Sequence, residues 1–120
     1  MRRLGELETS VMDVLWRTPE PMLVRAVLDE LNRDRNLAYT TVMTVLDNLF
    51  RKDWVTRERE GRAYRYRAAV SREEAAAQAL RDVLDAAGDS ESVLLHFAKS
   101  VSDSESDALR KALRRRPKAR

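Results

Sequence analysis

The stretch Leu37–Lys52, LAYTTVMTVLDNLFRK, decides the fold of this chain. In an α-helix its core-forming residues share one narrow arc, and they are Val42, Val45, Leu46 and Leu49. The opposite side carries Thr40, Thr44, Asp47 and Arg51. Threonine is a mediocre helix former, so three threonines in one helix cost stability unless they contact something. The stretch predicts a helix with one face in a core and a second face of small side chains that can enter a groove closely.

Two shorter amphipathic helices are predicted before this stretch. The first covers Leu4–Trp16, where apolar residues keep a helical spacing. It ends at Thr18–Pro21, because proline lacks a backbone N–H and disfavours helix in the preceding residue. The second covers about Met22–Asn32, and the polar segment 32–36 forms the turn that follows it.

An antiparallel hairpin is predicted after the third helix. Its strands cover Trp54–Arg59 and Ala63–Arg67, where apolar and charged residues alternate with a period of two. Gly61 stands at the tip, where a hairpin needs positive φ. Three helices followed by a basic two-stranded ribbon predict a mainly α fold, with a winged helix-turn-helix domain over residues 1–70.

Only helices are predicted beyond Val70. A capping box of Ser71 with Glu74 opens the first of them, which runs to about Ala87 and is closed by Gly88. The second helix covers roughly Glu91–Val101. A capping box of Ser102 with Glu105 opens the last, and residues 117–120 are expected to form a disordered basic tail.

The three C-terminal helices are expected to form a dimerisation domain over residues 71–116. About fifty residues are too few to bury a core alone, and such short segments usually need a disulfide, a metal or a partner. The chain has no cysteine, so a second copy is the predicted source of burial, in a symmetric homodimer. The predicted interface residues are Leu80, Val83, Leu84, Leu94, Phe97, Val101, Leu109 and Leu113.

Composition excludes several classes of function. Zero cysteines and a single histidine, His96, rule out thiolate and multi-histidine metal sites, and no cofactor is predicted. His96 has no partners for a catalytic triad, so the chain is predicted not to be an enzyme. The sequence lacks both the ~18-residue apolar run of a membrane span and a signal peptide, which predicts a cytoplasmic protein without membrane insertion.

The distribution of charge favours double-stranded DNA as the partner. Residues 39–68 hold seven Lys or Arg against four Asp or Glu, whereas residues 71–107 hold three against nine. The candidate base-contacting residues are Thr40, Met43 and Thr44. The candidate backbone contacts are Tyr39, Thr41, Arg51, Arg62 and Arg65. Asp47 would repel phosphate, so it either accepts a hydrogen bond from a cytosine amino group or holds Arg51 at i+4.

The sequence leaves three alternatives to DNA binding. A winged helix used for protein docking would expose apolar residues on the third helix, where this chain has small polar ones. RNA binding would need aromatic residues presented for stacking, and the alternation of Tyr64 and Tyr66 turns both inward. An enzyme is the third and most distant alternative.

Four segments resemble the BlaI/MecI-type penicillinase repressors. They are Leu4–Trp16 (L-G-x-L-E-x-x-V-M-x-x-L-W), Val24–Val27 (V-R-A-V), Tyr39–Leu46 (Y-T-T-V-M-T-V-L) and Leu94–Lys99 (L-L-H-F-A-K). The resemblance implies a winged-helix dimer that binds a pseudo-palindromic operator and represses β-lactamase, penicillin-binding-protein or related genes. It also implies a membrane sensor-protease that detects β-lactam, and cleavage of the repressor in its dimerisation region at an Asn-Phe bond, which corresponds here to His96–Phe97. The cysteine motif of the family's copper-responsive branch is absent.

Overall fold

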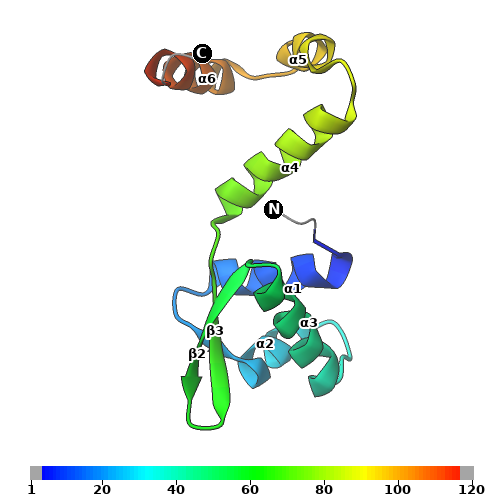
Figure 1. The fold of residues 1–120 in the computed structure, drawn as a ribbon, viewed down its shortest axis with the longest axis vertical. Helices are drawn as coiled ribbons and strands as arrows, with labels where there is room; N and C mark the ends of the chain where they lie inside the picture. The colour runs from blue at the N-terminus through cyan, green and yellow to red at the C-terminus, as the bar shows by residue number, and fades with distance from the viewer. Residues whose placement is uncertain (1–3, 117–120) are drawn as a thin grey trace. The chain divides into compact units, whose positions relative to one another are not determined.

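In the computed structural model, residues 4–116 are described, and they form six helices and three strands (Figure 1). In chain order these are α1 (Glu6–Arg17), β1 (Met22–Leu23), α2 (Val24–Leu31), α3 (Tyr39–Arg51), β2 (Val55–Glu60), β3 (Ala63–Ala68), α4 (Arg72–Ala86), α5 (Ser90–Ala98) and α6 (Asp103–Arg115). The chain divides into two compact units, the first ending at Ala79 and the second beginning at Leu80. The predicted domain limit near residue 70 stays a prediction, and the predicted tail at 117–120 lies outside the described residues.

The core of the first unit lies between α1, α2, α3 and the inner face of the sheet. Its largest fully buried side chains are Val11, Met12, Val27, Val42, Leu46 and Leu49. The predicted arc of α3 is confirmed, because Val42, Val45, Leu46 and Leu49 are all buried. The break after α1 is confirmed as well, since the helix ends at Arg17 just before the two prolines.

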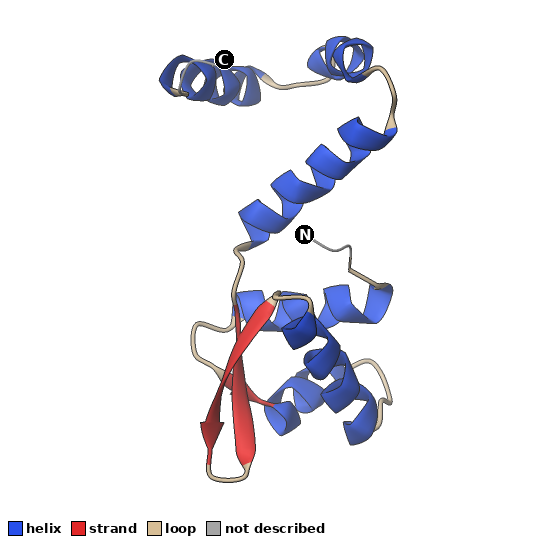
Figure 2. Cartoon of the chain, viewed as in Figure 1, coloured by secondary structure: helices blue, strands red, loops and turns tan. Residues whose placement is uncertain are grey.

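The small sheet has three antiparallel strands in the order β1-β3-β2, drawn in red in Figure 2. The predicted antiparallel hairpin is confirmed as β2 and β3, and a strand that was not predicted, β1, adds to it. The prediction of a helix starting at Met22 was wrong. Met22 and Leu23 pair instead with Tyr66 and Arg65 of β3, so these two residues are extended and α2 starts at Val24. Backbone hydrogen bonding to a strand more than forty residues away decides this, and helical periodicity cannot reveal it.

The end of α3 fixes the direction of the hairpin. The N–H of Asp53 donates to the Phe50 carbonyl and the N–H of Trp54 donates to the Leu49 carbonyl, which together form a Schellman motif. Asp53 takes the left-handed conformation that this motif requires, with φ of 66°. The predicted hairpin tip is confirmed, because Gly61 has φ of 63°.

Both predicted capping boxes are present. Ser71 Oγ accepts from the N–H of Glu74 at the start of α4, and Ser102 Oγ accepts from the N–H of Glu105 at the start of α6. The predicted extension of the middle helix to Val101 was wrong, because α5 ends at Ala98. There the N–H groups of Lys99 and Ser100 bond back three residues in a tight turn, which leaves Ser102 free to cap α6.

Within the described part of the chain, none of α4, α5 and α6 buries a side chain fully. The second unit therefore lacks a closed core of its own in the single chain. None of the described helices is both long and apolar enough to span a membrane.

Candidate nucleic-acid interface

The turn between α2 and α3 is held by one amide side chain. Asn32 Nδ2 donates to the Leu37 carbonyl at 3.0 Å, and Asn32 Oδ1 accepts from the Leu37 N–H at 2.8 Å. The guanidinium of Arg25 in α2 also lies 5.2 Å from the ring centroid of Tyr39 in α3. These contacts set the angle at which α3 leaves the turn.

The N-terminal half of α3 presents small polar and soft apolar side chains to solvent. Thr40, Thr41 and Thr44 are exposed, as are Tyr39 and Met43, which are 41% and 42% exposed. Within residues 4–116, no hydrogen bond occupies the three threonine hydroxyls. Free hydroxyls and methyl groups on a narrow helix face suit contact with base edges and phosphates in a major groove.

Asp47 is bonded within the protein to two arginines. Its Oδ2 lies 2.8 Å from Arg51 Nη2 one helical turn later, and its Oδ1 lies 3.3 Å from Arg57 Nη1 in β2. The i+4 partnership with Arg51, one of the two roles predicted for Asp47, is confirmed. The second partnership joins α3 to the hairpin. Sequence reasoning missed this contact, because it depends on how β2 packs.

Arg57 is the centre of the contact between α3 and the hairpin. Its guanidinium carbon lies 3.9 Å from the ring centroid of Phe50 in α3 and 4.2 Å from that of Tyr64 in β3. A hydrogen bond with the Tyr66 hydroxyl, partly opposed by burial, raises the pKa of the Arg57 guanidinium. Because its side chain is only 22% exposed, we assign Arg57 a structural role rather than phosphate contact.

A groove of about 470 Å³ lies between α3 and the hairpin. Its lining residues are Met43, Thr44, Asp47, Asn48, Arg51, Arg57, Tyr64 and Tyr66. We call it the α3–hairpin groove. It brings the candidate base-contacting residues Met43 and Thr44 together with Arg51. Tyr66 is buried and Tyr64 is half-buried, which confirms that both tyrosines face inward.

The arginines of the hairpin differ in their availability. Arg62 at the tip is exposed and, among residues 4–116, makes no ion pair or hydrogen bond. Arg65 is paired with Glu60 on the face of the sheet that points away from α3. Arg59 donates to the Gly61 carbonyl at 3.2 Å. Arg62 is thus available to a phosphate without giving up a partner, whereas Arg65 would first have to release Glu60.

The residues predicted for dimerisation carry large exposed apolar surfaces. The exposed fractions are 50% for Leu94, 51% for Phe97 and Leu109, 57% for Val83, and 59% for Leu80 and Leu113. Leu84 and Val101 are half-buried. His96 and Phe97, the predicted cleavage bond, lie in the last turn of α5.

A helix-turn-helix with a hairpin beside its third helix defines a winged-helix protein. The sequence model of the penicillinase repressor family matches residues 4–115. The chain is 47% identical over 116 residues to the transcriptional regulator BlaI of Mycobacterium tuberculosis strains CDC 1551 and H37Rv, covering 94% of this chain and 84% of the relative. The chain therefore belongs to the penicillinase repressor family. Both names describe transcriptional regulators, in agreement with the prediction that the chain is not an enzyme.

Two solved structures share the winged-helix fold. The solution structure of the DNA-binding domain of the repressor BlaI has a TM-score of 0.54 and 24% identity, covering 60% of this chain and 87% of that chain. The solution structure of the Bacillus licheniformis BlaI monomeric form in complex with the blaP half-operator has a TM-score of 0.51 and 23% identity, covering 61% and 88%. At these identities the likeness supports the fold.

Proposed function

We propose that this member of the family is a homodimeric repressor that binds a pseudo-palindromic operator in double-stranded DNA. The observation that carries the proposal is the exposed N-terminal face of α3, whose three threonine hydroxyls are free of partners within residues 4–116. In a major groove, base edges and phosphates would supply hydrogen-bond partners for these hydroxyls.

The positions of the side chains suggest which residues contact bases and which contact the DNA backbone. Thr40, Met43 and Thr44 contact base edges, and their methyl groups suit the methyl of thymine. The backbone contacts come from Tyr39, Thr41, Arg51, Arg62 and Arg65. The side chain of Arg51 is 72% exposed although it pairs with Asp47, so its guanidinium remains accessible to a phosphate.

Dimerisation is proposed from the apolar surface of the second unit. Six of the eight predicted interface residues are at least half exposed in the single chain. Several large apolar side chains exposed in one unit indicate an association site, and a second copy offers the same side chains in return. A symmetric dimer presents two copies of α3 to two half-sites, which is the arrangement that a pseudo-palindrome matches.

The regulated genes and the inducer are inferred from the relatives. Because relatives carry the name BlaI and one solved relative is bound to the blaP half-operator, we infer control of β-lactam-response or related genes. A membrane sensor-protease is the proposed partner for release, with His96–Phe97 as the bond. This bond lies in a regular helix, so α5 has to unwind locally before cleavage. Because the target is the chromosome, we place the protein in the cytoplasm.

The decisive experiment is footprinting on genomic DNA selected by the purified full chain. We expect a protected pseudo-palindrome beside the regulated genes, and an affinity that falls steeply as salt rises, because phosphate contacts release counterions. A flat response between low and physiological salt, or selection of no common sequence, would overturn the proposal.

A further inference from the structure

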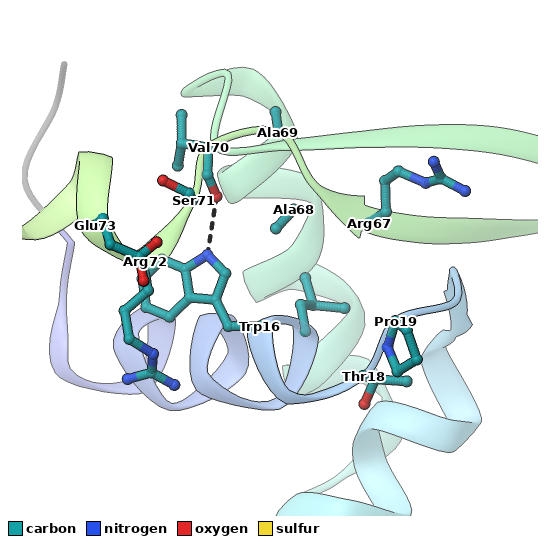
Figure 3. A pocket seen from close by; sticks show the side chains of 11 residues that line it. Trp16, Thr18, Pro19, Arg67, Ala68, Ala69, Val70, Ser71, Arg72 and Glu73 are labelled. Atoms are coloured by element: carbon teal, nitrogen blue, oxygen red, sulfur yellow. Dashed lines mark hydrogen bonds between the residues drawn. The ribbon is translucent and has the colours of Figure 1, made fainter.

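The segment that joins β3 to α4 is fastened to α1. The indole Nε1–H of Trp16 donates to the carbonyl oxygen of Val70 at 2.9 Å, the dashed line in Figure 3. A cavity of about 470 Å³ borders this segment and is lined in part by Ala69 and Ser71. Val70 also packs against the core of the first unit, so both apolar packing and this hydrogen bond hold the segment on α1.

A second set of contacts holds the first residue of α4. Arg72 Nη1 lies 3.3 Å from Asp13 Oδ1, and its guanidinium carbon lies 5.0 Å from the ring centroid of Trp16. Asp13 and Trp16 are both in α1, and Figure 3 shows Arg72 beside the indole ring. We call the group Asp13, Trp16, Val70 and Arg72 the α1 anchor.

No flexible linker separates the α1 anchor from the helix that follows. Residues 69–71 contain no glycine, and the capping box of Ser71 starts α4 at once. The helix then continues without interruption for 15 residues to Ala86 and carries Leu80 and Val83, which we propose for dimerisation. A regular helix keeps its direction along its length, whereas a Gly/Ser-rich linker does not.

We propose that the α1 anchor determines which spacing between two half-sites the dimer accepts. This inference rests on the proposed function. In B-DNA a shift of one base pair moves a half-site by about 3.4 Å and turns it by about 35°, since a helical turn holds 10–10.5 base pairs. We expect a dimer with an intact α1 anchor to accept that shift less readily than a dimer in which the α1 anchor is loosened.

The four anchor residues act as positioning residues. None of them lines the α3–hairpin groove. Asp13 and Trp16 lie in α1, Val70 follows β3, and Arg72 begins α4. Loosening the α1 anchor is therefore expected to change the tolerance for spacing and to leave the contact with a single half-site unchanged.

The test uses the full chain and a panel of duplexes derived from the footprinted operator, with zero, one, two or five base pairs inserted between the half-sites, plus a duplex with one half-site. Arg72→Ala removes the cation, Trp16→Phe removes the indole donor but keeps a ring, and Arg72→Lys keeps a cation. Arg81→Ala is the matched control, because Arg81 pairs with Asp85 inside α4. Binding is measured by fluorescence anisotropy, and helix content by circular dichroism.

For the wild type and Arg81→Ala, we expect one inserted base pair to weaken binding by about tenfold or more. For Arg72→Ala and Trp16→Phe we expect a loss of about threefold or less, with half-site affinity unchanged and partial recovery in Arg72→Lys. Wild-type spacing profiles in both variants would overturn the inference, as would a wild type indifferent to spacing, and in both cases the proposed function would stand. A wild type that binds neither the operator nor its half-site would instead refute the proposed function.

Discussion

Asp47 and Arg57 meet across the α3–hairpin groove, with Arg57 Nη1 3.3 Å from Asp47 Oδ1. The same guanidinium is bracketed by the rings of Phe50 and Tyr64. The position of the hairpin relative to α3 is therefore set by a charge-assisted bond and two cation–π contacts, in addition to apolar packing. Arg57 therefore adds specific contacts between the two surfaces that we propose to contact DNA.

Replacing Arg57 by alanine is expected to lower the free energy of unfolding by about 1–2 kcal/mol, because both cation–π contacts and the bond to Asp47 are lost. Arg57→Lys keeps the charge but loses the planar stacking on the rings, so its free energy of unfolding should lie between those of the wild type and Arg57→Ala. Urea denaturation measures the change. Arg67→Ala, an exposed arginine on the other face of the sheet, is the control. Equal midpoints for Arg57→Ala and Arg67→Ala would contradict the assigned role.

Replacing Asp47 by asparagine tests its effect on binding. The substitution keeps the shape of the side chain but removes a negative charge that holds Arg51 and that would repel phosphate in the proposed complex. We expect binding to non-operator DNA to strengthen by about threefold or more, with the slope of log K against log salt steeper by about one. The preference for operator over non-operator DNA should fall. Titration of both DNAs at several salt concentrations decides the matter, and an unchanged salt slope would refute the prediction.

Thr44→Ala and Arg62→Ala are expected to weaken binding in different ways. Loss of a base contact should reduce discrimination at one or two operator positions by about 1–3 kcal/mol per contact. Loss of a phosphate contact at the hairpin tip should weaken all sequences alike and reduce the salt slope by about one. Competition against a set of single-base operator variants separates the two effects. If both variants lost affinity uniformly, Thr44 would not contact a base.

Neighbouring leucines of α5 provide a matched test of dimerisation. Leu94 belongs to the proposed interface, whereas Leu95 is 66% exposed and does not. Leu94→Glu should convert the dimer to monomer at micromolar concentration, because a buried unpaired carboxylate costs several kcal/mol. Leu95→Glu should leave the dimer intact. Sedimentation or light scattering gives the answer, and a dimeric Leu94→Glu would exclude the proposed face.

Glu8 predicts a pH dependence of stability. Burial tends to raise the pKa of Glu8, but hydrogen bonds from the Gly5 N–H and the Lys52 ammonium, together with the Lys52 charge, lower the pKa below its ordinary value of 4.5. The pKa is lower in the folded protein, so the resulting stability is present above the unfolded-state pKa. It is lost as pH falls through the folded-state pKa.

The variant Glu8→Gln isolates this contribution. At pH 7 it should be less stable than the wild type by about 1 kcal/mol, because Lys52 loses its charged partner, 2.7 Å away, across α1 and α3. The difference should shrink as pH falls below about 4. Urea midpoints from pH 7 to pH 3 provide the measurement, with exposed Glu6→Gln as the control. A difference that persists unchanged at pH 3 would exclude this account.

The sequence by itself determined the features that obey local rules. The buried arc of α3, the break before Pro19, the positive φ at Gly61 and the two capping boxes follow from side-chain spacing and from the conformations open to single residues. The i+4 pair of Asp47 and Arg51 was predictable for the same reason, because one helical turn separates them.

Only the tertiary structure decided the contacts between distant segments. Met22 was predicted to be helical but is in a strand, because β1 pairs with β3. The folded chain also gave Asp47 its second partner, Arg57, and brought Trp16 to Val70, 54 residues away. No periodicity encodes such pairs, because their formation depends on how whole elements pack around the core. The composition of α3 thus marks a surface for contact, whereas the packing of α1 and of the hairpin decides how that surface is held.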